Sequence, residues 1–148
     1  AYLDRKYPDP PLFGKTPEET GLIWQAISEC ESYLVAEGNK VVRPVFFGKG
    51  LDKVDEIQQA AQTIREEWKS IDARLARSSW LVGKQISAAD IAVFPVVQLL
   101  LRAASKEAAQ PLELSLMPLS QTYPNIARWV GQIEALPGYE RTYPPHWR

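Results

Sequence analysis

The architecture of this chain can be predicted from one segment, which reads Trp80-Leu81-Val82-Gly83-Lys84-Gln85-Ile86-Ser87-Ala88-Ala89-Asp90-Ile91-Ala92. Ser87 and Asp90 stand at the spacing of a capping box, in which each side chain binds the backbone amide of the other residue. Ile86 and Ile91 occupy the two positions of a hydrophobic staple, which fixes the direction in which the chain enters a helix. The segment therefore predicts a helix that begins directly after Ser87.

The predicted helix continues as Ile91-Ala92-Val93-Phe94-Pro95-Val96-Val97-Gln98-Leu99-Leu100-Leu101, which is apolar on nearly every side. A helix of this kind is buried in the middle of a domain, and Pro95 is expected to bend it. The Ser87 hydroxyl is committed to the cap, and no Gly-x-Ser-x-Gly turn surrounds it. Ser87 and Asp90 are therefore predicted to be structural residues.

A long helix is predicted before this segment, over about residues 16–37. Thr16 fits its N-cap, Pro17 its first turn and Glu19 the acidic position of a second capping box. The helix is expected to end at Gly38-Asn39. Whether the chain becomes helical again from Val41 to Phe47 is left open by the sequence. The apolar face has a period of 3.6 residues and consists of Leu22, Ile23, Ala26, Ile27, Cys30, Tyr33 and Leu34.

Two more helices are predicted on either side of the central one. The first runs from Leu51 to about Ser78, with the apolar face Leu51, Val54, Ile57, Ala61, Ile64, Trp68, Ile71 and Leu75. The last begins at Pro124 and ends at Pro137-Gly138, with the apolar face Ile126, Trp129, Val130, Ile133 and Leu136. Residues 103–123 are ambiguous, because an alanine-rich sequence typical of a helix is interrupted by prolines. Since no segment alternates with period 2, the predicted fold is an all-α helical bundle around the helix that begins at Ser87.

Composition limits the classes of function. The chain has 148 residues, 45% of them hydrophobic and 24% charged, which is typical of one soluble globular domain. Lys and Arg number 17 against 18 Asp and Glu, a net charge of −1. We therefore expect no nucleic acid and no anionic membrane surface as a partner. The longest apolar run is too short to cross a bilayer.

Few residues offer chemistry. His146 is the one histidine and Cys30 the one cysteine, far apart in the sequence, so we predict no metal site. Gly48-Lys49-Gly50 and Gly83-Lys84-Gln85 lack the other residues of a phosphate-binding loop. Cys30 lies on the apolar face of its helix, which favours a buried thiol over a nucleophile. Trp68 and Trp129 are predicted core residues, whereas Trp147 either covers the core or lines a cleft.

The quoted segment resembles the signature of the C-terminal helical domain of cytosolic glutathione transferases, of bacterial type. Two further stretches also resemble this family. With the quoted segment they follow one another in the order found in the family, and the resemblance extends over the whole chain. Tyr123-Pro124-Asn125-Ile126-Ala127-Arg128-Trp129, followed by Pro137-Gly138-Tyr139, looks like the closing helix and exit turn of that domain. Residues 1–15, which open Ala1-Tyr2-Leu3-Asp4-Arg5-Lys6-Tyr7-Pro8, resemble the end of the family's thioredoxin-like domain and the linker after it.

The resemblance implies that residues 16–148 form the helical domain of a longer protein. The chain starts with Ala1 instead of Met, which we interpret as a start within that protein. In the family, the residues that activate glutathione lie in the thioredoxin-like domain, so no catalytic residue is predicted in this chain. On its own the chain is expected to be inactive.

The resemblance also suggests binding residues. The substrate-pocket candidates are Tyr33, Arg43, Phe46, Tyr143 and Trp147. Glu31 and Ser32 are candidates for contacting the glutathione of a neighbouring subunit. The implied protein is a cytoplasmic homodimer for detoxification, which conjugates glutathione to a hydrophobic electrophile or uses it as a reductant, with no metal. The alternative is a non-catalytic protein-interaction module of the same fold.

Overall fold

The computed structural model describes residues 2–144, and all the regular elements in that range are helical, which confirms the all-α class. In chain order they are α1 (Tyr2–Lys6), α2 (Pro17–Glu29), the π-helix η1 (Cys30–Val35), α3 (Ala36–Phe46), η2 (Gly50–Lys53), α4 (Val54–Leu75), α5 (Ala88–Ala104), η3 (Glu107–Leu112), α6 (Leu119–Thr122), α7 (Pro124–Glu134) and η4 (Tyr139–Arg141).

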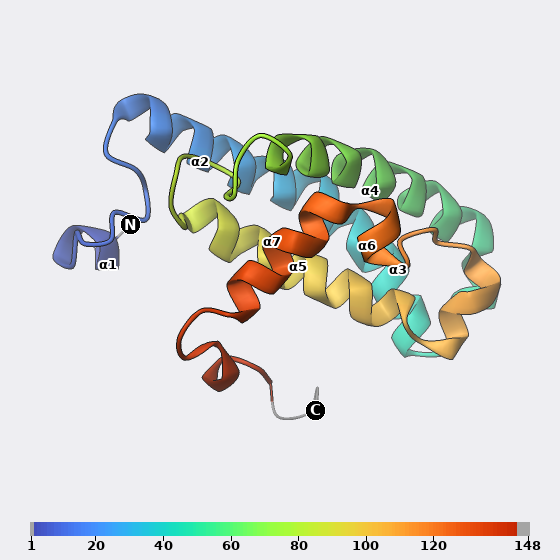
Figure 1. Ribbon diagram of the computed structural model, residues 1–148. Coiled ribbons are helices and arrows are strands. Elements are labelled where there is room, and N and C mark those ends of the chain that lie inside the picture. Colours follow the sequence, from blue (N-terminus) through green and yellow to red (C-terminus); the bar gives the residue numbers. More distant parts are fainter. Residues whose placement is uncertain (1, 145–148) are drawn as a thin grey trace.

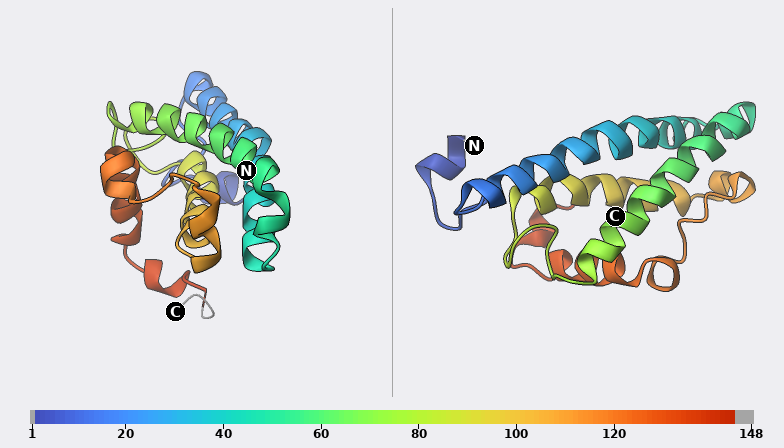
Figure 2. Two further views of the ribbon diagram at one scale, coloured as in Figure 1. Left: turned by 90° about the vertical axis from the view of Figure 1, so that its right-hand side faces the viewer. Right: turned by 90° about the horizontal axis from the view of Figure 1, so that it is seen from above.

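The helices surround α5. Figure 1 shows α2, η1 and α3 following one another as a long rod, beside which α4 runs back in the opposite direction. In the end view of Figure 2, α5 lies in the middle, with α4 above it, α3 on one side and α7 on the other. The direct packing agrees, because α5 contacts α2 and α3, and α4 contacts α3 and α7. Within residues 2–144, every helix is too short or too polar to span a bilayer.

The core contains the tryptophans predicted to lie there. Trp68 of α4 and Trp129 of α7 are both 0% exposed. Trp68 meets the ring of Tyr123 edge-on, with 5.3 Å between centroids. The periodic pattern therefore identified the buried faces of α4 and α7 correctly.

The expected helix stop at Gly38-Asn39 is wrong. Gly38 is buried inside α3, and the helical rod continues to Phe46. A Cβ atom at position 38 would lie 3.4 Å from Leu100 Cδ2, which is an ordinary van der Waals contact, so Gly38 lies where α3 packs against α5. Gly38 is a packing residue and not a cap.

Two other expectations need correction. Leu51 is 70% exposed, because α4 begins only at Val54 and the preceding η2 turn is out of phase with the apolar face. The central helix is not buried on every side: Ile91 is 51% exposed, and Pro95 is exposed as well. One face of α5 is thus apolar and uncovered.

Helices α4 and α7 cap each other. Asp72 of α4 accepts hydrogen bonds from the backbone amides of Asn125 (2.9 Å) and Ile126 (3.0 Å) at the start of α7. In return, Arg128 of α7 donates to the carbonyl oxygens of Leu75 and Ser78 at the end of α4. Since helix ends leave backbone groups without partners, each helix supplies what the other lacks.

Candidate functional site

An apolar groove lies between the first half of α5 and the segment that follows α7. Its volume is about 360 Å³. The lining is Ile86, Asp90, Ile91, Phe94, Pro95, Ile133, Leu136, Pro137, Gly138, Tyr139 and Thr142. A groove lined mainly by apolar side chains with a few polar groups is the usual form of a small-molecule site.

Aromatic rings build one wall of the apolar groove. Phe94 of α5 packs edge-on against Trp129 and against Tyr139, with 5.8 Å between centroids in both cases. Tyr139 in turn contacts Tyr143 at 6.4 Å. Burial raises the pKa of the Tyr139 phenol, and nearby Glu134 and Tyr143 add to the shift. The phenol is therefore neutral at physiological pH, and it gives the wall a polar but uncharged group.

The local sequence explains why the apolar groove forms. Val93 and Val97 face the core from α5, which leaves Ile91, Phe94 and Pro95 on the other side of the helix. The groove's second side comes from the segment after α7, which turns back at Gly138. The φ angle of Gly138 is +86°, in the left-handed region that glycine adopts at little cost.

Asp90 fixes the helix end beneath the apolar groove. Its Oδ2 accepts from the Ser87 amide and from the Ser87 hydroxyl, both at 2.9 Å, within the capping box predicted from the sequence. Its Oδ1 accepts from the Leu81 amide at 3.0 Å and from Trp129 Nε1 at 2.9 Å. This carboxylate is 0% exposed and joins α5 to the preceding loop and to α7. With four donors already bound, Asp90 is a structural anchor and not a free acid or base.

The candidate pocket residues do not form one cluster. Tyr143 does not line the apolar groove itself but contacts Tyr139, which does. Tyr33 is 49% exposed on η1. Phe46 lies beneath the cations of Arg102 (5.4 Å) and Lys106 (5.7 Å) on the side of α3 that faces α5.

The remaining candidates lie elsewhere. Arg43 lines a separate groove between α3 and α4. Glu31 and Ser32 are exposed on η1, and Trp147 lies outside the described residues. Ile91 and Phe94 line the apolar groove but were assigned from the sequence only to the staple and to the buried helix. The sequence signal that could have identified them is the number of apolar residues on all sides of α5, which we interpreted as complete burial of that helix.

Cys30 does not supply a reactive thiol. The side chain is 4% exposed. Burial raises the pKa of the thiol to about 11, and the charge of Glu31 adds to the shift. Within residues 2–144, no group of His, Cys, Asp and Glu side chains is arranged to hold a metal ion. The lining of the apolar groove suits an apolar molecule or protein segment. Among the described residues, that lining includes no cysteine, histidine or serine that could act as a nucleophile.

Comparisons with known proteins fit this geometry. The sequence profile described as "Glutathione S-transferase, C-terminal domain" matches residues 54–132, more than half of the chain. No curated protein matches the chain in a sequence search. Among solved structures, the chain is similar to poplar glutathione transferase F1, with a TM-score of 0.72 and 17% identity over 95% of this chain and 62% of that one.

Two more structures are similar. Glutathione transferase F2 from Populus trichocarpa gives a TM-score of 0.72 and 20% identity, over 95% of this chain and 63% of that one. A glutathione S-transferase of class Gtt2 from Vibrio parahaemolyticus gives a TM-score of 0.71 and 20% identity, over 94% of this chain and 61% of that one. Identities this low establish the fold alone. The chain spans less than two thirds of the length of each of these structures.

Proposed function

This chain belongs to the family of glutathione S-transferase C-terminal domains, and from that premise we propose that it is the helical part of a glutathione transferase. In this proposal the apolar groove is one wall of the site for a hydrophobic electrophile. The other wall and the glutathione site come from a thioredoxin-like domain, to which residues 1–15 connect. The observation that carries the proposal is the apolar groove, where Ile91 of the central helix is 51% exposed beside the partly buried ring of Phe94.

The proposed reaction depends on a thiolate. Glutathione would attack the electrophile through its sulfur, or would reduce a peroxide or a disulfide and become oxidised itself. Either reaction needs the thiol pKa to be lowered toward neutrality. The described residues that line the apolar groove include no cation that would lower a thiol pKa, and their one carboxylate, Asp90, is already fully hydrogen-bonded. We therefore assign thiol activation to the thioredoxin-like domain and no catalytic residue to this chain.

Some of the binding candidates have roles within this proposal. Tyr143 has the best support, since it adjoins the aromatic wall of the apolar groove. Glu31, Ser32 and Tyr33 share the π-helix η1, and π-helical turns occur frequently at functional sites. We propose that this exposed turn faces the partner subunit of a homodimer, where Glu31 or Ser32 would reach its glutathione. A cytoplasmic location accords with this use of glutathione.

The direct test compares two proteins on the same assays. The complete gene product should be retained by glutathione resin and should conjugate glutathione to chlorodinitrobenzene. The chain 1–148 should do neither, because it lacks the thiol-activating domain. Retention without measurable conjugation by the complete product would point to the reductant role, to be assayed with an organic peroxide.

Two outcomes would contradict the proposal. If the complete gene product showed neither retention nor turnover with either substrate, the non-catalytic interaction module would be the better description. If purified 1–148 conjugated glutathione at a rate above the uncatalysed reaction, the assignment of catalysis to another domain would be wrong. Circular dichroism of both proteins provides the control for correct folding.

A further inference from the structure

The segment between α1 and α2 is held by hydrogen bonds from both of these helices. Asp4 of α1 accepts, through Oδ1, the backbone amides of Leu12 (2.8 Å) and Phe13 (3.3 Å). The carbonyl oxygen of Phe13 accepts from the hydroxyl of Thr20 in α2 at 2.7 Å. Connecting segments are ordinarily more mobile than the helices they join, whereas this one is bonded at successive residues. We call residues 11–15 the docked linker.

The docked linker also caps the central helix. The carbonyl oxygen of Leu12 accepts the amide of Ala88, the first residue of α5, at 2.8 Å. The first amides of a helix have no partner inside the helix, so this bond adds to the capping box of Ser87 and Asp90. Leu12 therefore connects two helices: its amide binds Asp4 of α1, and its carbonyl oxygen binds α5. Figure 1 shows α1 and the starts of α2 and α5 at the same end of the molecule.

Gly14 brings the docked linker into close contact with α2. Its φ is +83°, in the left-handed region, and a Cβ atom at this position would lie 2.6 Å from the Cβ of Glu19. The Glu19 carboxylate accepts the amide of Lys15 at 2.8 Å. The ring of Phe13 packs against Trp24, with 5.3 Å between centroids. These contacts fix the path of the docked linker over the bundle.

Helix α1 has little apolar packing of its own. None of its residues is buried, and Tyr2 and Leu3 are 74% and 68% exposed. Asp4 is half-buried and carries the two hydrogen bonds to the docked linker. The direction of α1 relative to α5 is therefore set by Asp4 and the docked linker, and not by burial of an apolar face.

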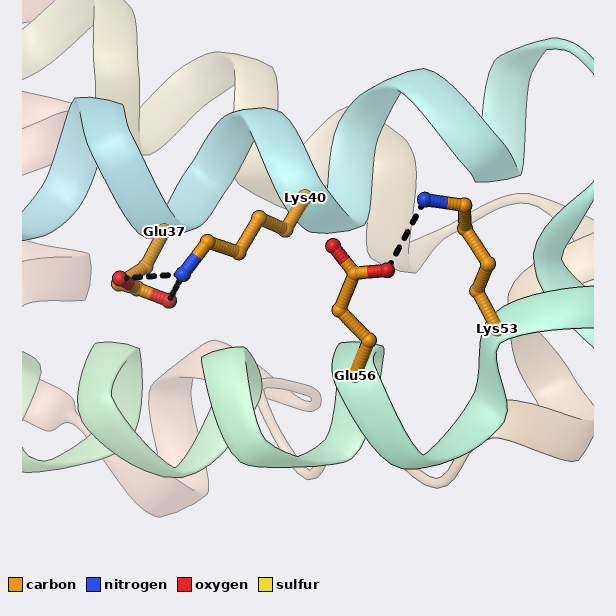
Figure 3. Close-up of polar contacts among 4 residues, drawn as sticks. All are labelled: Glu37, Lys40, Lys53 and Glu56. Carbon is orange, nitrogen blue, oxygen red and sulfur yellow. Dashed lines mark hydrogen bonds and ion pairs between the residues drawn. The ribbon is translucent and has the colours of Figure 1, made fainter.

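Two ion pairs beside the connection between α3 and α4 are of a different kind. Lys40 binds Glu37 at 2.8 Å, and Lys53 binds Glu56 at 2.9 Å (Figure 3). Each pair joins partly exposed side chains three residues apart, and such pairs contribute little to stability. The bonds of Asp4 instead reach eight and nine residues along the chain. They join α1 to a segment that is itself bonded to α2 and α5, so their loss changes how these elements are placed.

We propose that Asp4 is a positioning residue: through the docked linker it fixes α1, and the domain that precedes it, relative to α5 and the apolar groove. This inference rests on the proposed function, in which residues 1–15 connect a thioredoxin-like domain to the helical part. Glutathione held by one domain must then meet an electrophile held against the other, and a misplacement of about 1 Å can cost on the order of a hundredfold in rate. Asp4 itself contacts neither substrate.

The first measurement uses chain 1–148 and needs no enzymatic activity. Backbone amide hydrogen exchange is followed by NMR in the wild type and in Asp4→Ala, which keeps a good helix former in α1. The critical amide is that of Ala88, because its acceptor is Leu12 and not Asp4. Its exchange should become about tenfold faster or more in Asp4→Ala, since the docked linker then leaves the start of α5.

The matched control is Asp9→Ala, which removes an exposed acid from the same part of the chain. It should leave the exchange of Ala88 within about twofold of the wild type. Asp4→Asn keeps one acceptor oxygen and should restore most of the protection. Thermal unfolding shows whether all variants fold. Unchanged exchange of Ala88 in Asp4→Ala, or equal acceleration in Asp4→Ala and Asp9→Ala, would overturn the role of Asp4 in docking the linker.

The second measurement uses the complete gene product. Asp4→Ala should reduce kcat/KM for chlorodinitrobenzene by about tenfold, with glutathione affinity within about twofold, because the glutathione site lies in one domain. Asp4→Asn should recover most of the activity, and Asp9→Ala should match the wild type. Small-angle scattering should show a larger radius of gyration for Asp4→Ala than for Asp9→Ala.

The outcomes separate this inference from the proposed function. If the wild-type complete product shows no turnover, the proposed function fails, and scattering still decides whether Asp4 positions the preceding domain. If the wild type is active and Asp4→Ala is equally active, the positioning role is wrong. An equal loss of glutathione affinity and of kcat/KM would place Asp4 in the glutathione site and would likewise overturn the inference.

Discussion

At the scale of single residues, Asp90 is the carboxylate on which the helix arrangement most depends. It is fully buried and accepts hydrogen bonds from Leu81, Ser87 and Trp129. The capping box required Ser87 and Asp90 to be three residues apart, so that part could be predicted. The bond from Trp129 depends on α7 packing beside α5, and no local pattern contains it.

Asp90→Ala should therefore lower the free energy of unfolding by about 3 kcal/mol or more, since it leaves several buried donors without an acceptor. Chemical denaturation of chain 1–148 measures the change. Asp55→Ala is the control: it also removes an acidic residue from the first turns of a helix, but at an exposed position, and should cost less than about 1 kcal/mol. Similar losses for both variants would contradict the anchoring role.

Cys30 is the second residue with a definite prediction. With a pKa of about 11, about one thiol in a thousand is ionised at pH 8, and the side chain is also buried. The native chain should therefore resist iodoacetamide at pH 8 and react promptly in denaturant, as followed by mass spectrometry. Reaction of the native protein at the rate of a free thiol would show that Cys30 is accessible and that its role must be reconsidered.

At the scale of elements, the π-helix η1 connects α2 to α3 without breaking the rod. A π-turn contains one residue more than an α-turn. Deleting one exposed residue from it therefore restores α-helical geometry and keeps the buried faces of α2 and α3 in line. The same deletion inside α3 instead rotates the following residues by about 100°, and turns Val41 and Val45 out of the core.

We accordingly expect deletion of Ser32 to lower the melting temperature by only a few degrees, whereas deletion of Asn39 should abolish cooperative unfolding. Both residues are exposed, so the comparison isolates the effect of helical register. Differential scanning calorimetry of the two variants measures it. If the Ser32 deletion were as damaging as the Asn39 deletion, η1 would not be acting as a one-residue insertion.

At the scale of the whole molecule, the apolar groove is the surface that this chain does not cover itself. Ile91→Lys should change the stability of chain 1–148 by less than about 0.5 kcal/mol, because the side chain is already half exposed. If another domain and a substrate occupy the apolar groove in the complete gene product, the same substitution there should reduce kcat/KM for conjugation by about tenfold or more. Steady-state kinetics with chlorodinitrobenzene provides the measurement.

Leu51→Lys is the matched control, because Leu51 is also exposed and apolar but belongs to η2 and does not line the apolar groove. It should leave both stability and conjugation unchanged. Equal kinetic effects of the two substitutions would argue against a specific role for the apolar groove. A strong loss of stability in chain 1–148 with Ile91→Lys would instead show that Ile91 belongs to the core.

The sequence by itself determined the helical class, the starts of the helices at Thr16 and Ser87, and the burial of Trp68 and Trp129. These features depend on residues within one or two turns of each other, where caps and periodic apolar faces operate. Family resemblance added the expected functional context and the candidate residues; of the candidates within residues 2–144, Tyr143 is the one that adjoins the apolar groove.

The tertiary structure alone decided the rest. Gly38 reads as a stop in the sequence, but in the fold it is buried inside α3, where that helix packs against α5. Asp72 and Arg128 cap helices that lie more than fifty residues away along the chain. The apolar groove likewise forms between α5 and the segment after α7, which the sequence separates. A local pattern contains no information on which faces meet, because this depends on how all the helices pack at once.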